Sequence, residues 1–181
     1  MRLILTALAF SVGLTGCLIN AADYERPAPT VLPVDLTHDE VAWATERGEN
    51  AVLGQALMRT RGGEMKTCAG LEVLLIPVSA YSAARIENMF GGEATGFAYN
   101  MGRAFTPDPT AFHDSMRRTI CDAHGNFTFD GLPDGKYYVI ARVVWDAVQG
   151  SSYIYTAQQG GFLMSRLSVT GGISHRVILT A

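Results

Sequence analysis

The 181-residue sequence has little of the positive charge that binding to nucleic acid needs. Lysine and arginine together number 14 against 17 acidic residues, and Lys66 and Lys136 are the only lysines. No basic run occurs, and the net charge is -3, so a phosphate backbone finds no basic surface to bind. We therefore expect no nucleic-acid partner.

Catalytic and metal-binding signatures are missing as well. The histidines are scattered at His38, His113, His124 and His175. They form no H-E-x-x-H motif, neither Cys68 nor Cys121 lies in C-x-x-C, and no G-x-S-x-G elbow marks a nucleophilic serine. We expect a non-catalytic protein without a metal or another cofactor.

The apolar run at the N-terminus is too short to cross a bilayer as a helix. Leu3 to Val12 follows the positive segment Met1-Arg2, which is the arrangement of a signal peptide. The run leads into Leu14-Thr15-Gly16-Cys17, which resembles a bacterial lipobox. This resemblance implies removal of residues 1–16 and lipidation of Cys17, with acyl chains such as palmitate.

The alternative is an ordinary secretory signal in which Cys17 is incidental. Four lipobox positions at the right distance from the apolar run favour lipidation. Leu18, rather than Asp, follows the cysteine, and in enteric-type bacteria this resembles export to the outer membrane. We expect a lipid-anchored protein of the cell envelope, on the outer membrane and facing the periplasm or the surface.

Residues 17–48 are predicted to connect the lipid to the folded domain at 49–181. Three prolines between residues 18 and 33 favour an extended, semi-rigid spacer. Thr37-His38-Asp39-Glu40 then resembles a capping box and predicts a short helix. Val41 and Trp43 are expected to dock this helix onto the domain; the alternative is a loop with an exposed Trp43.

Two strands with tight turns are the strongest fold signal, between Cys121 and Trp145. Phe127 and Phe129 alternate with polar residues, as in a half-buried strand. After Gly135 the residues of one parity are Tyr137, Val139, Ala141, Val143 and Trp145. These residues are expected to face the core.

The segment from Asp122 to Val139 resembles the D-x-x-G-x-F-x-F-x-x-L-P-x-G-x-Y-x-V signature of carboxypeptidase regulatory-like domains. The resemblance extends more weakly to Ala51–Arg59, Leu71–Val78 and Ile173–Leu179. It implies an all-β, transthyretin-like sandwich of about seven strands in Greek-key order. Such domains are mostly non-catalytic binding or spacer modules, so the resemblance identifies a fold rather than a ligand.

The remaining strands are placed by their apolar patterns. Leu71–Val78 is apolar on both faces except for Glu72, which predicts a central strand. Further strands are predicted at Ser152–Ala157, Phe162–Thr170 and Ile173–Thr180. The last two are expected to form a hairpin through Gly171-Gly172.

Two cysteines remain once Cys17 is lipidated. Disulfides persist in exported proteins, so we expect Cys68 and Cys121 to be joined.

Residues 82–115 form an insertion that is too long for a simple connection. Ser82 is predicted to cap a short helix that ends at Gly91-Gly92. Candidate binding residues in the insertion are Phe97, Tyr99, Phe105 and Phe112, and Tyr138 is added because its parity is opposite to that of Tyr137. The alternative is that the aromatic residues of the insertion only cover one end of the sandwich.

Together these patterns favour a non-catalytic binding or assembly module with an envelope protein or carbohydrate as its partner. The alternative is an accessory domain or enzyme that acts on envelope carbohydrate or peptide through the insertion.

We predict that Cys17→Ser abolishes acylation and membrane retention. Several acyl chains, each contributing about 0.8 kcal/mol per buried methylene, hold a protein stably on a membrane. Intact-mass analysis and membrane fractionation of the wild type and the variant measure the effect. An unchanged mass and an unchanged membrane fraction would contradict lipidation at this residue.

Overall fold

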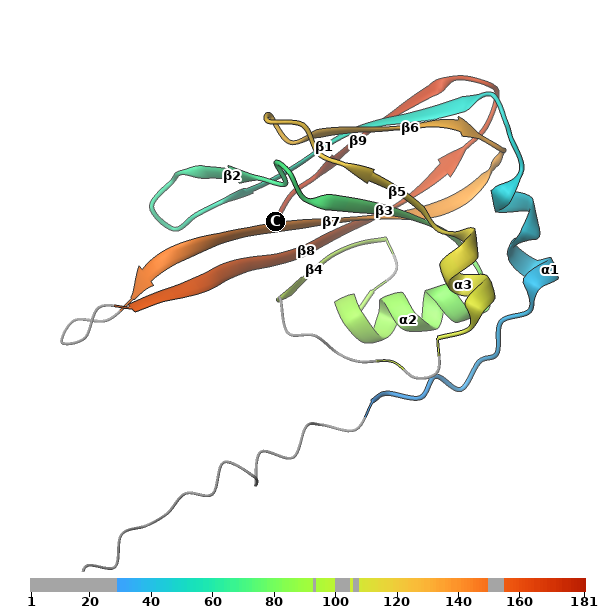
Figure 1. Ribbon diagram of the computed structural model, residues 1–181, viewed down its shortest axis with the longest axis horizontal. Coiled ribbons are helices and arrows are strands. Elements are labelled where there is room, and N and C mark those ends of the chain that lie inside the picture. The colour runs from blue at the N-terminus through green and yellow to red at the C-terminus, as the bar shows by residue number, and fades with distance from the viewer. Residues whose placement is uncertain (1–28, 93, 100–104, 106–107, 150–154) are drawn as a thin grey trace, which may run out of the picture.

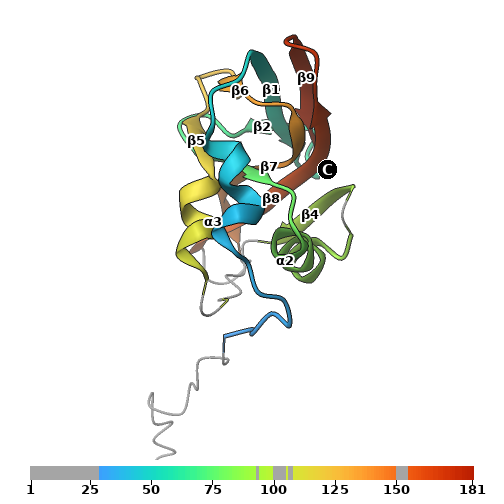
Figure 2. The ribbon, with the colours of Figure 1, turned by 90° about the vertical axis from the view of Figure 1, so that its right-hand side faces the viewer.

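The computed structural model describes residues 29–92, 94–99, 105, 108–149 and 155–181. Two β-sheets pack face to face, and helices lie along the outer face of one sheet (Figure 1). The view turned by 90° separates the same layers (Figure 2). The predicted all-β sandwich with a helical insertion is confirmed, with nine strands in the described ranges where the sequence predicted about seven.

The four-stranded sheet is built around β1 (Asn50–Arg59). β1 pairs antiparallel with β2 (Met65–Thr67) and β6 (Asn126–Leu132). It pairs in parallel with β9 (Ser174–Leu179). The predicted hairpin through Gly171-Gly172 is therefore wrong, because the chain crosses at these glycines from one sheet to the other.

The five-stranded sheet has the order β4-β8-β7-β3-β5, and neighbouring strands are antiparallel. In chain order its strands are β3 (Glu72–Pro77), β4 (Thr95–Tyr99), β5 (Arg117–Ile120), β7 (Gly135–Gln149) and β8 (Tyr155–Val169). β3 lies inside the sheet, as its apolar pattern predicts.

Gly160 and Gly161 do not end a strand, although the sequence predicts separate strands on either side of them. A Cβ at Gly160 would lie 2.2 Å from the carbonyl oxygen of Val143, and one at Gly161 would lie 2.1 Å from that of Ala98. Glycine is thus required because the neighbouring backbones approach closely. Residues 152–154 of the predicted strand Ser152–Ala157 lie outside the described residues.

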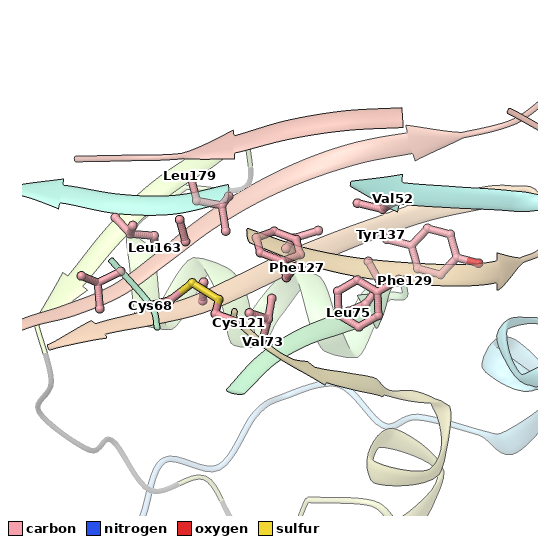
Figure 3. Close-up of a cluster of buried hydrophobic side chains, with 14 of the residues drawn as sticks. Val52, Cys68, Val73, Leu75, Cys121, Phe127, Phe129, Tyr137, Leu163 and Leu179 are labelled. Atoms are coloured by element: carbon pink, nitrogen blue, oxygen red, sulfur yellow. A yellow bond between two sulfur atoms is a disulfide. The ribbon is translucent and has the colours of Figure 1, made fainter. Parts of the chain in front are cut away.

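The main core lies between the sheets, and the predicted inward face of β7 supplies much of it (Figure 3). Tyr137, Val139, Ala141 and Val143 are at most 1% exposed, and Trp145 packs against them. The capping box at Thr37 is confirmed at the start of α1 (His38–Val41), which continues into the 3₁₀ helix η2 (Ala42–Thr45). The docking of Trp43 is also confirmed, because its ring meets that of Tyr137 edge-on at 5.4 Å.

A second apolar cluster lies on the outer face of the five-stranded sheet, beneath α2 (Ala80–Phe90) and α3 (Thr110–Ser115). Its buried members are Leu36, Val41, Ile76, Tyr81, Ile86, Phe112, Tyr138, Ile140 and Met164. Tyr138 is 0% exposed, so its assignment as a surface contact is wrong. Its parity was predicted correctly, but the insertion covers the face that it occupies.

Helix α2 begins one turn earlier than the sequence predicts. Ser79, not Ser82, is its N-cap: the Ser79 hydroxyl accepts a hydrogen bond from the Ser82 backbone N–H at 3.1 Å. The Ser82 hydroxyl accepts one from the Ser79 N–H at 2.8 Å, which completes a reciprocal cap. Gly91 ends the helix with a φ of 70°, which glycine adopts without strain.

The predicted signal peptide and Cys17 fall within residues 1–28, outside the described residues. In the part of the chain that is described, no helix combines the length and apolarity needed to cross a membrane.

The predicted disulfide between Cys68 and Cys121 is confirmed. Cys68 follows β2 of one sheet and Cys121 follows β5 of the other, so the bond ties the two sheets together. Both cysteines are buried in the main core (Figure 3).

We predict that the double variant Cys68→Ala, Cys121→Ala folds with a free energy of unfolding lower by about 4 kcal/mol. The bond spans 53 residues, and in the chain-entropy model a loop of this length restricts the unfolded chain by about that amount. Urea unfolding of oxidised wild type and of the variant measures the difference, with reduced wild type as the matched control. Equal unfolding midpoints for all three would contradict a stabilising bond.

Candidate functional site

A cavity of about 530 Å³ lies between the outer face of the five-stranded sheet and the helices α2 and α3. This volume is within the range of small-molecule sites. Its apolar lining consists of Leu74 and Ile76 of β3, Ile140 of β7, Phe162 of β8, Met89 of α2, Phe112 of α3, and Met116. The insertion thus forms one wall of the cavity, and the sheet forms the other.

Strand β4 closes one side of the cavity through Phe97, Ala98 and Tyr99. Ala98 is paired with Phe162, so these two side chains share a face of the sheet. Phe97 and Tyr99 alternate to the other face, where Phe97 packs against the main core. The methyl group of Ala98 is therefore the side chain that β4 places on the cavity side, and its small size leaves space there.

Three basic side chains contribute to the cavity lining: Arg85 of α2, His113 of α3 and Arg118 of β5. No Asp or Glu among the described residues lines it. Arg118 is half-exposed, with its Nε 3.6 Å from a carboxylate oxygen of Glu72. The charged groups that reach the cavity are consequently all of one sign.

Arg85 is held by a carboxylate and by two aromatic rings. Its Nη1 donates to Oδ1 of Asp108 at 2.5 Å. Its guanidinium carbon lies 4.2 Å from the ring centroid of Phe105 and 5.0 Å from that of Phe112, which are cation–π distances. The Tyr81 hydroxyl donates to the same Asp108 oxygen at 2.5 Å. Carboxylate and rings together fix the position of the guanidinium.

The pKa of Tyr81 is raised to about 12. Burial is the largest cause, because it disfavours the phenolate. The hydrogen bond to Asp108 and the negative charge of that carboxylate raise the pKa further, while Arg85 opposes them.

The predicted binding residues have different positions around this site. Phe112 lines the cavity and is 3% exposed, and Phe105 is buried against Arg85. Tyr99 is 72% exposed, and its ring meets that of Phe97 edge-on at 5.0 Å. The aromatic residues of the insertion therefore cover the sheet and also border a cavity.

The sequence indicates Arg85 as a polar residue of the insertion that could contact a partner, but it gives no reason to choose Ala98 or Arg118, which also line the cavity. The available signal was the apolar second face of β3 and β7, since Leu74, Ile76 and Ile140 need a covering layer.

The described ranges hold no group of three or more His, Cys, Asp or Glu side chains placed to bind a metal ion.

Fold and cavity define a β-sandwich protein with a helix-covered pocket on one sheet. Comparison of the chain with protein-family models and with curated proteins finds no match. Among solved structures, a Pseudomonas aeruginosa protein described as a candidate carbohydrate-binding protein has a similar fold. The TM-score is 0.67 at 24% sequence identity, and the match covers 83% of this chain and 99% of that one. At this identity the likeness establishes the fold alone.

We predict that Asp108→Asn lowers the pKa of Tyr81 from about 12 toward 10, but not fully to 10, because burial persists. An absorbance titration measures tyrosine ionisation, and Tyr81→Phe identifies the signal. Because the folded wild type holds this proton more tightly than the unfolded chain does, its Tyr81-linked stability is present below pH 10 and declines as the pH rises toward 12. A Tyr81 titration that is unchanged in Asp108→Asn would contradict the assigned role of the carboxylate.

Proposed function

We propose that this protein is a non-catalytic binding module of the cell envelope, anchored through a lipid on Cys17, with its ligand held in the cavity between α2, α3 and the five-stranded sheet. The observation that carries the proposal is the cavity itself. It combines about 530 Å³ of space, an apolar wall and a few polar groups at one edge. This combination is typical of small-molecule binding sites.

The scaffold around the cavity suits a preformed site. The strands that line it are packed on their other face against the main core, and the disulfide joins the two sheets. On the opposite wall, α2 is capped at both ends, and Arg85 is held by Asp108. A site on such elements keeps its shape, which limits the entropy lost on binding.

Binding is better supported than catalysis by the chemistry of the lining. A glycan hydrolase commonly needs a pair of carboxyl groups on either side of the scissile bond. Among the described residues no carboxylate lines the cavity, and Asp108 beside it is engaged by both Arg85 and Tyr81. The insertion is accordingly proposed as a ligand-binding wall rather than as a carrier of catalytic groups.

Carbohydrate is a second candidate ligand class, and its support lies at the rim of the cavity, where Tyr99 is exposed. The Pseudomonas aeruginosa protein of similar fold is described as a candidate carbohydrate-binding protein. In this chain the exposed ring of Tyr99, beside Phe97, offers an aromatic surface against which a sugar can pack. Since Ala98 and Tyr99 lie on opposite faces of β4, variants at these two positions separate the two candidate sites.

We predict that a small molecule copurifies with the lipidated wild-type protein. The variant Ala98→Phe is expected to lower the amount bound by roughly tenfold or more. The added ring occupies the cavity, so the ligand is displaced. Protein extracted from envelopes in mild detergent is washed and then analysed by mass spectrometry for bound small molecules. Ala69→Phe, at an exposed turn away from the cavity, is the matched control.

Melting temperatures and circular dichroism establish that both variants fold. A species lost only from Tyr99→Ala supports the carbohydrate candidate. Identical bound species in the wild type, Ala98→Phe and Tyr99→Ala would contradict ligand binding at either site.

A further inference from the structure

The cavity has an apolar wall and a basic edge, and this division indicates the class of its ligand. Leu74, Ile76, Ile140 and Phe162 form a continuous apolar surface on the sheet side. Met89 and Met116 add unbranched side chains that adapt to the shape of a ligand. A flexible hydrocarbon chain satisfies this surface, whereas sugar hydroxyl groups would be buried there without partners.

The basic edge adds a requirement for charge. Arg85, His113 and Arg118 reach the cavity, and the acidic partners Asp108 and Glu72 do not line it. Asp108 accepts a hydrogen bond from one of the five N–H donors of the Arg85 guanidinium. The planar arrangement of these donors suits the two oxygens of a carboxylate. Asp108 and Glu72 balance the two arginine charges, but it is the guanidinium groups that reach the cavity, so the edge offers N–H donors that suit a carboxylate of a ligand.

The position of Arg85 makes it the anchor of this edge. Its side chain is only 19% exposed, and the rings of Phe105 and Phe112 exclude water from its sides. A charge-assisted hydrogen bond is stronger in such surroundings than in open solvent. Arg118 is 47% exposed and supplies a second, weaker attraction at the outer edge.

We infer that the cavity binds an amphiphilic carboxylate of the fatty-acid class, with its acyl chain on the apolar wall and its carboxylate at Arg85 and Arg118. This inference rests on the proposed function, because it names the ligand class for the same cavity. The neutral alcohol with the same chain fills the apolar wall but gains nothing at the basic edge. The cationic amphiphile with that chain meets guanidinium groups rather than carboxylates at the lining, so it gains no ion pair there and binds more weakly than the carboxylate.

The test uses full-length lipidated protein at a fixed detergent concentration, with ¹³C-methyl methionine. Octanoate, octanol and octyltrimethylammonium are titrated separately, and the Met89 and Met116 methyl signals, assigned by Met→Leu variants, report occupancy. Partition of each probe into detergent is the same for all variants of the protein. Comparison between variants for one probe therefore isolates binding to the cavity.

Two changes test the basic edge. Arg118→Gln is expected to weaken octanoate binding about three- to fivefold, because it removes an exposed charge. The double variant Arg85→Gln, Asp108→Asn removes the buried cation together with its counter-ion, so neither member of the pair is left alone. It is expected to weaken octanoate binding roughly tenfold. Both are expected to leave octanol binding unchanged, and Arg176→Gln, on β9 of the other sheet, is the matched control.

Ala98→Phe is expected to abolish the methyl shifts with octanoate and with octanol. If octanoate and octanol bind equally and neither arginine change matters, the fatty-acid inference is overturned while ligand binding at the cavity stands. If a maltooligosaccharide is the only probe that shifts the methyl signals, the fatty-acid inference is likewise overturned, and ligand binding at the cavity stands. If no probe shifts them and no copurifying species depends on Ala98 or Tyr99, both the inference and the proposed function fail.

Discussion

The five-stranded sheet is apolar on both faces, and the rest of the structure follows from the need to cover each of them. On β7, Tyr137 and Val139 face inward, while Tyr138 and Ile140 face outward, and all four are at most 5% exposed. The four-stranded sheet covers the inner face, and α2 with α3 covers the outer face. The insertion is thus a structural layer, and the space left between this layer and the sheet is the cavity.

A charged group at the edge of an apolar layer needs partners, and Arg85 has them. Asp108 neutralises it, Tyr81 donates to the same carboxylate oxygen, and two aromatic rings flank the guanidinium. A buried ion pair of this kind adds little net stability, because desolvation offsets the attraction. Its main physical effect is geometric, since it fixes the direction of a cation that borders the cavity.

The protein of similar fold is described as a candidate carbohydrate-binding protein, whereas the cavity of this chain has an apolar wall and a basic edge. A shared sandwich constrains the core, whereas ligand chemistry depends on the residues of individual surfaces. In this chain the two candidate surfaces lie on opposite faces of one edge strand, with Tyr99 on one and Ala98 on the other. Strand β4 therefore places Ala98 in the cavity and the exposed ring of Tyr99 at its rim.

Alternation alone determined the strands β6 and β7 and the inward face of β7, because side chains of one parity must share a face. The disulfide followed from the prediction that the chain is exported, with two cysteines left once Cys17 is lipidated. Phe97, Tyr99 and Phe112 were predicted as candidate binding residues and do border the cavity, but the cavity itself was not predicted. Parity assigns a side chain to a face without saying what covers it, so only the tertiary structure decided that Tyr138 is buried. Long-range packing likewise decided that β9 pairs with β1, and that Arg85, Ala98 and Arg118, from three separate elements, border one space.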